Sequence, residues 1–336
     1  MELFNIAELI KKPPTEEILT EELLMNYLKE GIKLKHYQGF EISGFLHIGN
    51  GILSAMKIRD FQYAGVETNI FLADYHSWIN KKLGGDLDTI RRVALGYFRE
   101  ALKYALKCVG GDPDKVNFIL ASQLYEKLGI RYLENVIKIS NLLTANRVKR
   151  ALTIAGRKEG ESLTFSQLLY VPMQVADIFS LGINLAHGAI DQRKAHVIAL
   201  EVGKEFGYKP VAVHHHVLLK LIRNEDEWKR LINSATSEEG SIIESKMSKS
   251  KPESCIFIHD SEEEIQKKIY NCFCPPREIR YNPVLEILKY IIFPLFSEKE
   301  AIEIKNLKTG KVTFYKDYLE LERDYMRGNI HPLDLK

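Results

Sequence analysis

The sequence is poor in cysteine. Its four cysteines in 336 residues are too few for a disulfide framework. Cys108 and Cys255 each stand alone among apolar residues, where a small buried thiol is the expected role. Cys272 and Cys274 form a C-x-C pair without a second pair, which argues against a zinc site. The run His214 to His216 does not change this expectation, because neighbours on a strand point to opposite faces. We expect no metal bound by the protein alone.

Long apolar runs and an excess of charge of one sign are also missing. No stretch approaches the roughly 20 apolar residues of a membrane helix, and the N-terminal segment lacks the apolar core of a signal peptide. We therefore expect a soluble, cytoplasmic protein without a membrane partner. The formal net charge is only +2, too small to hold DNA or another long nucleic acid through the overall field, so a polyanion must meet local patches.

A hydrophobic content of 45% is ample for a folded core. Residues 34–65 read as a strand, a glycine-containing turn and a helix, in which Lys57, Arg59 and Asp60 lie away from the apolar face. The segments 68–79 and 116–121 read as further strands, separated by a helix over 90–108. This alternation predicts an α/β fold with a doubly wound, parallel sheet of the Rossmann type, covered on both faces.

The pattern divides the chain into three parts. Residues 1–30 are expected to form a helical N-terminal segment, and residues 31–255 the catalytic domain. Within that domain, 126–190 read as a helical connecting region, and 210–219 as a strand that rejoins the sheet. From 262 onward the strand signal fades, so residues 256–336 are assigned to a smaller, mostly helical C-terminal domain.

A glycine-rich turn follows the first predicted strand, where doubly wound sheets bind ligands. Gly44 and Gly49 would let a ligand approach the backbone, and His47 and Asn50 could donate hydrogen bonds to phosphate or ribose oxygens. The turn is neither a Walker A loop nor a dinucleotide fingerprint. Taken alone, it is equally compatible with a tight connection between two elements.

A second segment, ESKMSKSKPES, places Lys246 and Lys249 among serine hydroxyls with almost no apolar side chains. By itself this is typical of a solvated lysine loop. Its combination with a nucleotide-type fold that opens on H-I-G-N instead favours binding of a phosphorylated ligand.

A third pattern lies in the apolar helix around residue 174. Tyr170, Gln174 and Asp177 fall at i, i+4 and i+7 and form a narrow polar stripe. The stripe could be a sparsely polar exposed face. If it is buried, its polar groups require partners, which an amphiphilic ligand would supply.

These residues carry a resemblance to a known family. HIGN resembles the HIGH element, and KMSKS is identical to the second signature, of class I aminoacyl-tRNA synthetases. The blocks YQGFEISGFLHIG, FLADYHSWINKKLGGDL, YVPMQVADI and GAIDQRKAHVIA closely resemble the archaeal and eukaryotic tyrosyl-tRNA synthetases. The similarity runs from about residue 30 to the end of the chain.

The resemblance implies ATP-dependent ligation of L-tyrosine to tRNA(Tyr) through a tyrosyl-adenylate, with ATP and Mg²⁺ as cofactors. It assigns catalysis to four residues, which are His47, Asn50, Lys246 and Lys249. It assigns ATP binding to the same four residues together with Gly44 and Gly49. Asn50 replaces the usual histidine, and its amide can donate a hydrogen bond but cannot carry a charge.

The resemblance also implies the residues that bind tyrosine and tRNA. Tyr37, at the end of the first strand, and Asp177 would bracket the phenolic hydroxyl of the substrate. Its ammonium and carboxylate would be held by Tyr170, Gln174 and Gln192. For tRNA, the implied contacts are Arg193 at the acceptor end and His331 and Asp334 at the anticodon.

The family also implies a homodimer, with 126–190 as the expected interface. Two other functions remain open from the sequence. One is a tryptophanyl-tRNA synthetase, which shares the sheet and motifs but has no use for the pair Tyr37 and Asp177. The other is a catalytically inactive RNA-binding paralogue, against which the retention of His47, Lys246 and Lys249 speaks.

Overall fold

The computed structural model describes residues 3–157, 161–234, 245–247, 249, 251–296 and 300–336. The chain clusters into two compact units. The first comprises residues 1–45 and 54–215, and the second residues 46–53 and 216–336. Residues 216–255 thus cluster with the C-terminal residues and not with the sheet. No helix in the described part of the chain is both long and apolar enough to span a membrane.

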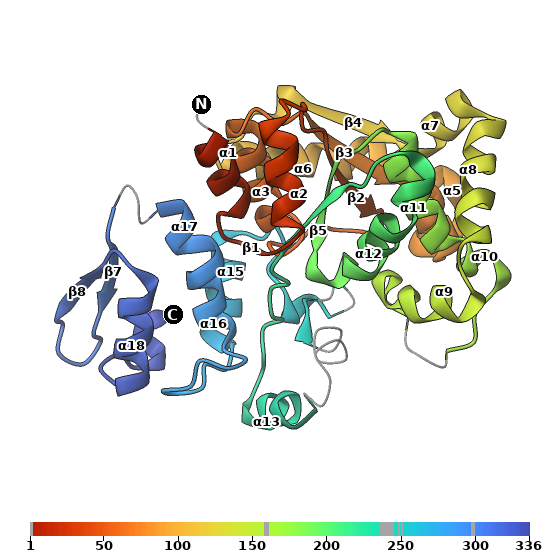
Figure 1. Cartoon of the computed structure of the whole chain (residues 1–336). Helices are drawn as coiled ribbons and strands as arrows, with labels where there is room; N and C mark the ends of the chain where they lie inside the picture. Colours follow the sequence, from red (N-terminus) through yellow and green to blue (C-terminus); the bar gives the residue numbers. More distant parts are fainter. Residues whose placement is uncertain (1–2, 158–160, 235–244, 248, 250, 297–299) are drawn as a thin grey trace. The chain divides into compact units, whose positions relative to one another are not determined.

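The first unit is built on a six-stranded sheet (Figure 1). Its strands are β1 (Thr15–Leu19), β2 (His36–Glu41), β3 (Thr68–Ala73), β4 (Val116–Leu120), β5 (Leu185–Ala189) and β6 (Val211–His215). They lie in the order β1-β6-β5-β2-β3-β4, and all except β1 are parallel. The strand order reverses between β2 and β5, which is the switch point where such sheets bind ligands. The predicted Rossmann-type sheet is confirmed.

Helices cover both faces of this sheet. One apolar cluster packs against α8 (Ile130–Asn141), α9 (Ala145–Ala151), α11 (Tyr170–Ser180) and α12 (Arg193–Val202). The other packs against α1 (Leu3–Lys11), α2 (Glu21–Lys29) and α3 (Ile52–Tyr63). The unit also contains α4 (Asp74–Ile79), α5 (Leu87–Val93), α6 (Arg99–Cys108), α7 (Ala121–Leu128) and α10 (Phe165–Leu168). Successive residues of a strand therefore face different cores.

The second unit contains α13 (Glu225–Ser234), α15 (Glu262–Asn271), α16 (Pro283–Ile287), α17 (Phe293–Phe296) and α18 (Tyr318–Arg327). It also contains an antiparallel hairpin of β7 (Ile302–Lys305) and β8 (Val312–Tyr315). The C-terminal part is mostly helical, as expected from residue 262 onward, but the sequence analysis did not predict this hairpin. The segment IEIKNLKTGKVTFY alternates apolar and polar residues on both sides of a turn, which is the usual pattern of a hairpin.

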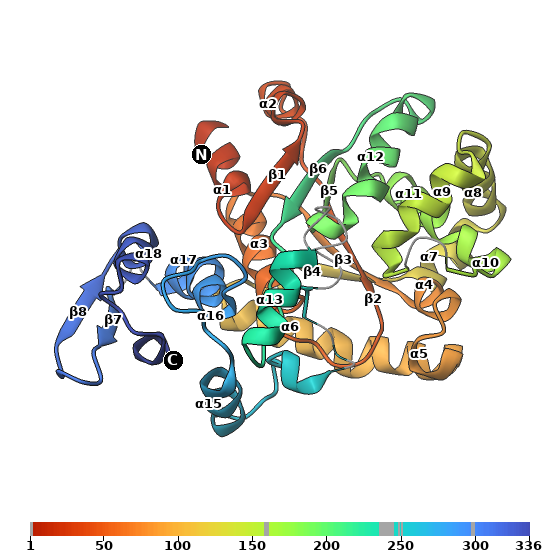
Figure 2. The same ribbon diagram turned by 90° about the horizontal axis from the view of Figure 1, so that it is seen from below.

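Two further strands were missed. The N-terminal segment is not purely helical, because β1 adds antiparallel to β6 at the edge of the sheet (Figures 1 and 2). The region 126–190 contains β5, which pairs with β2 and β6 in the centre of the sheet. The sequence of β5, Leu-Ala-His-Gly-Ala, has no β-branched residue, and its strand conformation depends on its two neighbours.

The charged residues of α3 are buried, contrary to the expectation of an outward face. The side chain of Lys57 is 0% exposed, and its ammonium donates to the carbonyls of Leu9, Ile10 and Lys12. Asp60 accepts from both Lys57 and Arg59. Burial lowers the pKa of Lys57 to about 8. The cluster joins α3 to the carbonyl-rich end of α1.

The cysteines and histidines follow expectation in part. Cys255 is buried as expected, whereas Cys108 is exposed at the end of α6. His214 and His215 point to opposite faces of β6, because the first contacts His196 and the second contacts His187. Among the described residues, no group of three or more histidine, cysteine or acidic side chains is placed to hold a metal ion.

Candidate functional site

The sequence analysis placed Tyr37 at the end of the first strand. In the structure, Tyr37 is instead the second residue of β2. Its side chain extends over the following residues of the strand. A Cβ atom on Gly39 would lie 2.5 Å from the Tyr37 hydroxyl oxygen. The glycine therefore gives room for the ring to lie flat along the strand and to place its hydroxyl beyond Gly39. The ring is buried, with an exposed fraction of 2%, and packs against Phe71.

The polar stripe of α11 is buried, which excludes the alternative of an exposed face. Tyr170, Gln174 and Asp177 are all buried, and Asp177 has an exposed fraction of 0%. Burial raises the pKa of Asp177 to about 8, and two hydroxyl donors partly oppose the shift. The negative charge of Asp177 also contributes to the raised pKa of Tyr37. The two residues predicted to bracket a phenol are therefore electrostatically coupled within one unit.

Two tyrosines that the sequence did not reveal fix the orientation of Asp177. The hydroxyls of Tyr125 on α7 and Tyr132 on α8 both donate to Asp177 Oδ1, each at 2.9 Å. Their rings stack with centroids 3.8 Å apart. Asp177 Oδ2 is buried and has no hydrogen-bond partner. One carboxylate oxygen is thus anchored by the protein, and the other is left for a ligand.

His76, on α4, lies beside this second oxygen. Its Nε2 atom is 3.7 Å from Asp177 Oδ2, too far for a hydrogen bond. Its ring meets the ring of Tyr170 edge-on, with centroids 4.7 Å apart. Burial lowers the pKa of His76 to about 4, so the imidazole is neutral at physiological pH. It therefore adds polar wall to the site without adding charge.

The far end of the stripe faces groups suited to an amino acid backbone. Tyr170 is hydrogen-bonded to Glu41, the last residue of β2, and burial together with this carboxylate raises the pKa of its phenol. Gln174 Nε2 donates to Gln192 Oε1 at 3.3 Å, and Gln192 donates to the carbonyl of Ile154. The five predicted tyrosine-binding residues all come from β2, α11 and the turn before α12. Glu41 was missed, although it follows Tyr37 by four residues.

The H-I-G-N turn belongs to the second unit, where backbone hydrogen bonds hold it. Ile48 N–H donates to the carbonyl of Ile256, and Ile258 N–H donates to the carbonyl of Leu46. The Asn50 side-chain oxygen accepts from His47 N–H at 2.9 Å. The amide NH₂ of Asn50 is therefore the end that can donate to a ligand, as the sequence-based role of this residue requires.

His47 has a defined tautomer. Its Nδ1 accepts from Gly49 N–H at 3.2 Å, which leaves the proton on Nε2 as the donor. A Cβ on Gly49 would lie 3.1 Å from this ring, so the glycine permits the close turn. Burial, with further contributions from Lys249 and Lys246, lowers the pKa of His47 to about 3. The positive charges of Lys246 and Lys249 therefore make protonation of the His47 ring less favourable.

The KMSKS segment is described at Ser245, Lys246, Met247 and Lys249, whereas Ser248 and Ser250 lie outside the described residues. The backbone of Lys246 pairs with that of Leu219 in an isolated antiparallel β-bridge, and the side chain of Met247 is buried. Lys246 and Lys249 are each partly exposed.

Gly44, which was also assigned to ATP binding, lies in the first unit. It adopts a φ of +106°, a conformation that favours glycine.

The residues assigned to tRNA lie in separate units. Arg193 opens α12 and is about half exposed. His331 and Asp334 form a capping box in the last turn of the chain. Asp334 also accepts from the backbone of Leu307 and the side chain of Asn306, next to the β7–β8 turn. The carboxylate is therefore held in place although it lies near the end of the chain.

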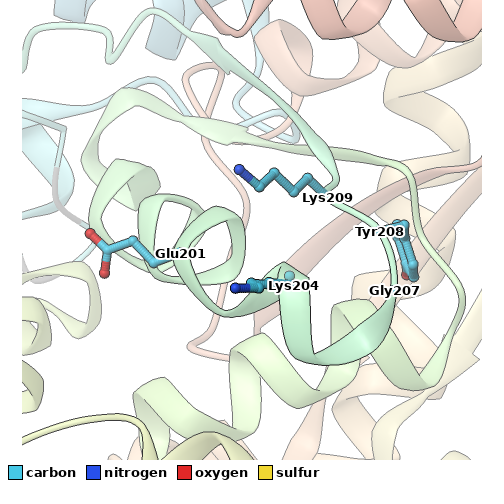
Figure 3. A pocket seen from close by; sticks show the side chains of 6 residues that line it. Glu201, Lys204, Gly207, Tyr208 and Lys209 are labelled. Atoms are coloured by element: carbon cyan, nitrogen blue, oxygen red, sulfur yellow. The ribbon is translucent and has the colours of Figure 1, made fainter.

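A separate cavity of about 500 Å³ lies in the first unit and contains none of the predicted site residues. It is lined by Glu201, Gly203, Lys204, Gly207, Tyr208 and Lys209. Figure 3 shows the ammonium groups of both lysines directed to the side on which Glu201 lies.

Comparison with known proteins identifies the family to which this chain is similar. The model of the class I tRNA synthetases for tryptophan and tyrosine matches residues 29–336. A tyrosine–tRNA ligase of Thermococcus gammatolerans is 50% identical over all of this chain and 91% of the relative. A tyrosine–tRNA ligase of Pyrococcus furiosus is 47% identical with the same coverage.

Solved structures agree with these sequence relatives. The tyrosyl-tRNA synthetase of Pyrococcus horikoshii, crystallised with L-tyrosine, has a TM-score of 0.90 and 47% identity, and the match covers 100% of this chain and 91% of that one. A tryptophanyl-tRNA synthetase of Encephalitozoon cuniculi, 19% identical with a TM-score of 0.65 over 99% and 84% of the two chains, shares the fold. This chain belongs to the class I tRNA synthetase family, and within it to the tyrosyl type of archaea and eukaryotes.

Proposed function

We propose that this protein activates L-tyrosine with ATP and transfers it to tRNA(Tyr). The observation that carries the proposal is the buried carboxyl group of Asp177. Its Oδ1 is saturated by two tyrosine hydroxyls, and its Oδ2 has no hydrogen-bond partner. A substrate phenol would supply the missing partner, with the Tyr37 hydroxyl on its other side. An indole lacks a hydroxyl at that position, which disfavours tryptophan.

The first step needs no general base. The carboxylate of tyrosine is ionised at neutral pH, and one of its oxygens attacks the α-phosphorus of ATP. The bond to the bridging oxygen breaks, and pyrophosphate leaves with the electron pair. Mg²⁺ enters with ATP as part of the substrate, bound mainly through phosphate oxygens. Catalysis then depends on position and on stabilising the charge of the leaving group.

The proposal assigns this stabilisation to residues of the H-I-G-N and KMSKS elements. His47 Nε2–H and the Asn50 amide donate to phosphate oxygens, while Lys246 and Lys249 neutralise the charge that develops on pyrophosphate. His47 is neutral, since its pKa is lowered to about 3, so it serves as a hydrogen-bond donor and not as a cation. In the second step, a terminal ribose hydroxyl of tRNA attacks the tyrosyl carbonyl, and AMP leaves.

Tyrosine-dependent exchange of pyrophosphate into ATP tests the first step. We expect exchange with tyrosine and none above background with tryptophan or phenylalanine. Lys249→Ala should reduce the rate by about 10²-fold or more, as for other groups that stabilise transition-state charge. Lys251→Ala, an exposed lysine two residues away, is the matched control and should retain the rate. Unimpaired exchange in Lys249→Ala would remove the loop from the mechanism.

For tRNA(Tyr), the proposal assigns Arg193 to the acceptor end and His331 and Asp334 to the anticodon. The guanidinium of Arg193 is suited to a phosphate or a base edge. The carboxylate of Asp334 is oriented by two backbone N–H donors and by the side-chain amide of Asn306, which favours selective pairing with a base. We propose a cytoplasmic location, where tRNA(Tyr), tyrosine and ATP are all available.

The proposed assembly is a homodimer through the exposed side of α8. Ile130, Leu133 and Ile137 follow one another at helical spacing and have exposed fractions of 66%, 50% and 50%. The opposite side of the helix carries Tyr132 and Val136, which are buried in the core. A helix that is apolar on both sides is typical of an element between a core and a partner.

A further inference from the structure

The edge strand β1 brings an acidic side chain to the residue that the proposed function assigns to the tRNA acceptor end. Glu17 is paired in register with His214 of β6, next to an irregularity between Thr15 and Glu17. Bulges of this kind re-aim side chains at the edges of sheets. Arg193, the first residue of α12, donates through Nε to both carboxylate oxygens of Glu17, at 2.9 Å each.

Buried histidines hold the carboxylate in turn. His214 is 0% exposed and lies with its Nδ1 atom 2.8 Å from Glu17 Oε2. A carboxylate can only accept, so the proton of His214 is on Nδ1. Its Nε2 then accepts from His196 Nδ1–H at 2.9 Å. Burial, together with the charge of Arg193, lowers the pKa of His214 to about 3 and keeps the ring neutral.

The chain of contacts thus runs from the buried His196 through His214 and Glu17 to a side chain at the surface. Arg193 is 48% exposed, and Glu17 is 27% exposed. An isolated surface ion pair contributes little to stability. The pair of Glu17 and Arg193 differs, because the buried His214 donates a hydrogen bond to the Glu17 carboxylate. The carboxylate therefore holds the Arg193 guanidinium in one orientation before any ligand binds.

We propose that Glu17 is a positioning residue for tRNA: it orients Arg193 toward the acceptor end, with His214 fixing the carboxylate. The inference rests on the tRNA role proposed for Arg193. Glu17 does not touch the reacting atoms and has no part in adenylate formation. Its contribution is to reduce the conformational freedom that Arg193 would otherwise lose on binding. The edge strand is therefore a functional addition to the sheet.

The test separates the two steps of the reaction. Glu17→Ala should raise the KM for tRNA in aminoacylation about 2- to 10-fold, the range expected for ordering one long side chain. The KM for tyrosine in pyrophosphate exchange should not change. Glu17→Gln retains one acceptor oxygen and should restore part of the loss. Glu16→Ala, at the exposed neighbouring residue, is the matched control and should behave as the wild type.

A double-mutant cycle makes the role specific. In an Arg193→Ala background, Glu17→Ala should add less than about 2-fold to the KM for tRNA, because the residue it orients is gone. Equal effects in both backgrounds, a matching rise in the KM for tyrosine, or a lower KM for tRNA in Glu17→Ala would each overturn the inference. So would an Arg193→Ala variant with unchanged tRNA kinetics. Loss of tyrosine-dependent exchange in the wild type would instead contradict the proposed function itself.

Discussion

The position of the Tyr37 hydroxyl depends on the absence of a side chain at residue 39. In Gly39→Ala, the added methyl carbon would lie 2.5 Å from the Tyr37 hydroxyl oxygen and 3.1 Å from ring atom Cζ. Neither contact is tolerable without movement. The ring cannot turn away freely, since it is buried and packs against Phe71 with centroids 5.6 Å apart. The variant must therefore displace the phenol or the strand.

Gly39→Ala should therefore change two quantities that can be measured separately, the free energy of unfolding and the KM for tyrosine. Overpacking a filled core lowers the free energy of unfolding by about 1–3 kcal/mol. Displacing the hydroxyl removes a hydrogen bond to the substrate phenol, which contributes about 0.5–1.5 kcal/mol. The KM for tyrosine should therefore rise about 2- to 10-fold. Urea denaturation measures the first quantity, and pyrophosphate exchange at varied tyrosine concentration measures the second.

The variant Tyr37→Phe supplies the control. It removes the hydroxyl oxygen, and with it the 2.5 Å contact, while the ring carbon at 3.1 Å remains. Gly39→Ala should therefore cost much less stability in this background than in the wild type, and should raise the KM for tyrosine little further. If Gly39→Ala destabilises both backgrounds equally, or leaves the KM for tyrosine of the wild type unchanged, the hydroxyl does not occupy the position inferred here.

Two other predictions concern Asp177 and α8. The pKa of Asp177 is about 8 in the folded protein and 3.8 ordinarily, so folding takes up a proton between these values. The stability of the wild type relative to Asp177→Asn should fall by up to about 1.4 kcal/mol per pH unit as the pH rises through this window; parallel urea denaturation profiles from pH 5 to 8 would contradict this. If the proposed dimer forms through α8, Leu133→Asp should convert it to monomers in sedimentation experiments, whereas Lys138→Asp, which changes a polar residue on the same helix, should not. A dimeric Leu133→Asp would exclude this surface.

Local pattern was sufficient to predict the elements that have a regular period. The spacing of Tyr170, Gln174 and Asp177 on α11 could be read from the sequence because a helix repeats every 3.6 residues. Strands β2, β3, β4 and β6 followed from short apolar runs. β5 did not, because its five residues become a strand only between β2 and β6. Pairing across the sheet is a property of distant segments.

The same limit applies to the site. Tyr125, Tyr132 and His76 come from three helices, and nothing in their local sequence relates them to residue 177. They meet Asp177 only after the sheet and its covering helices have formed. The buried charges of α3 are a further case, because Lys57 is satisfied by carbonyls almost fifty residues earlier in the chain. Sequence patterns show which side chains are polar, whereas long-range packing decides which of them are buried together.

In the proposed function, selectivity for a phenol would follow from the different environments of the two oxygens of Asp177: the protein donates hydrogen bonds to Oδ1 and none to Oδ2. If both were satisfied by the protein, a bound phenylalanine would leave no oxygen of Asp177 without a partner. Because Oδ1 alone is anchored, a ligand without a hydroxyl would leave the buried Oδ2 without a hydrogen-bond partner, at a cost of about 1–3 kcal/mol, or more when it is charged. Protonated, Oδ2 can donate to the phenol oxygen, and ionised, it can accept the phenol proton. The carboxyl therefore selects the hydroxyl in either state, and the two anchoring tyrosines prevent it from turning to another partner.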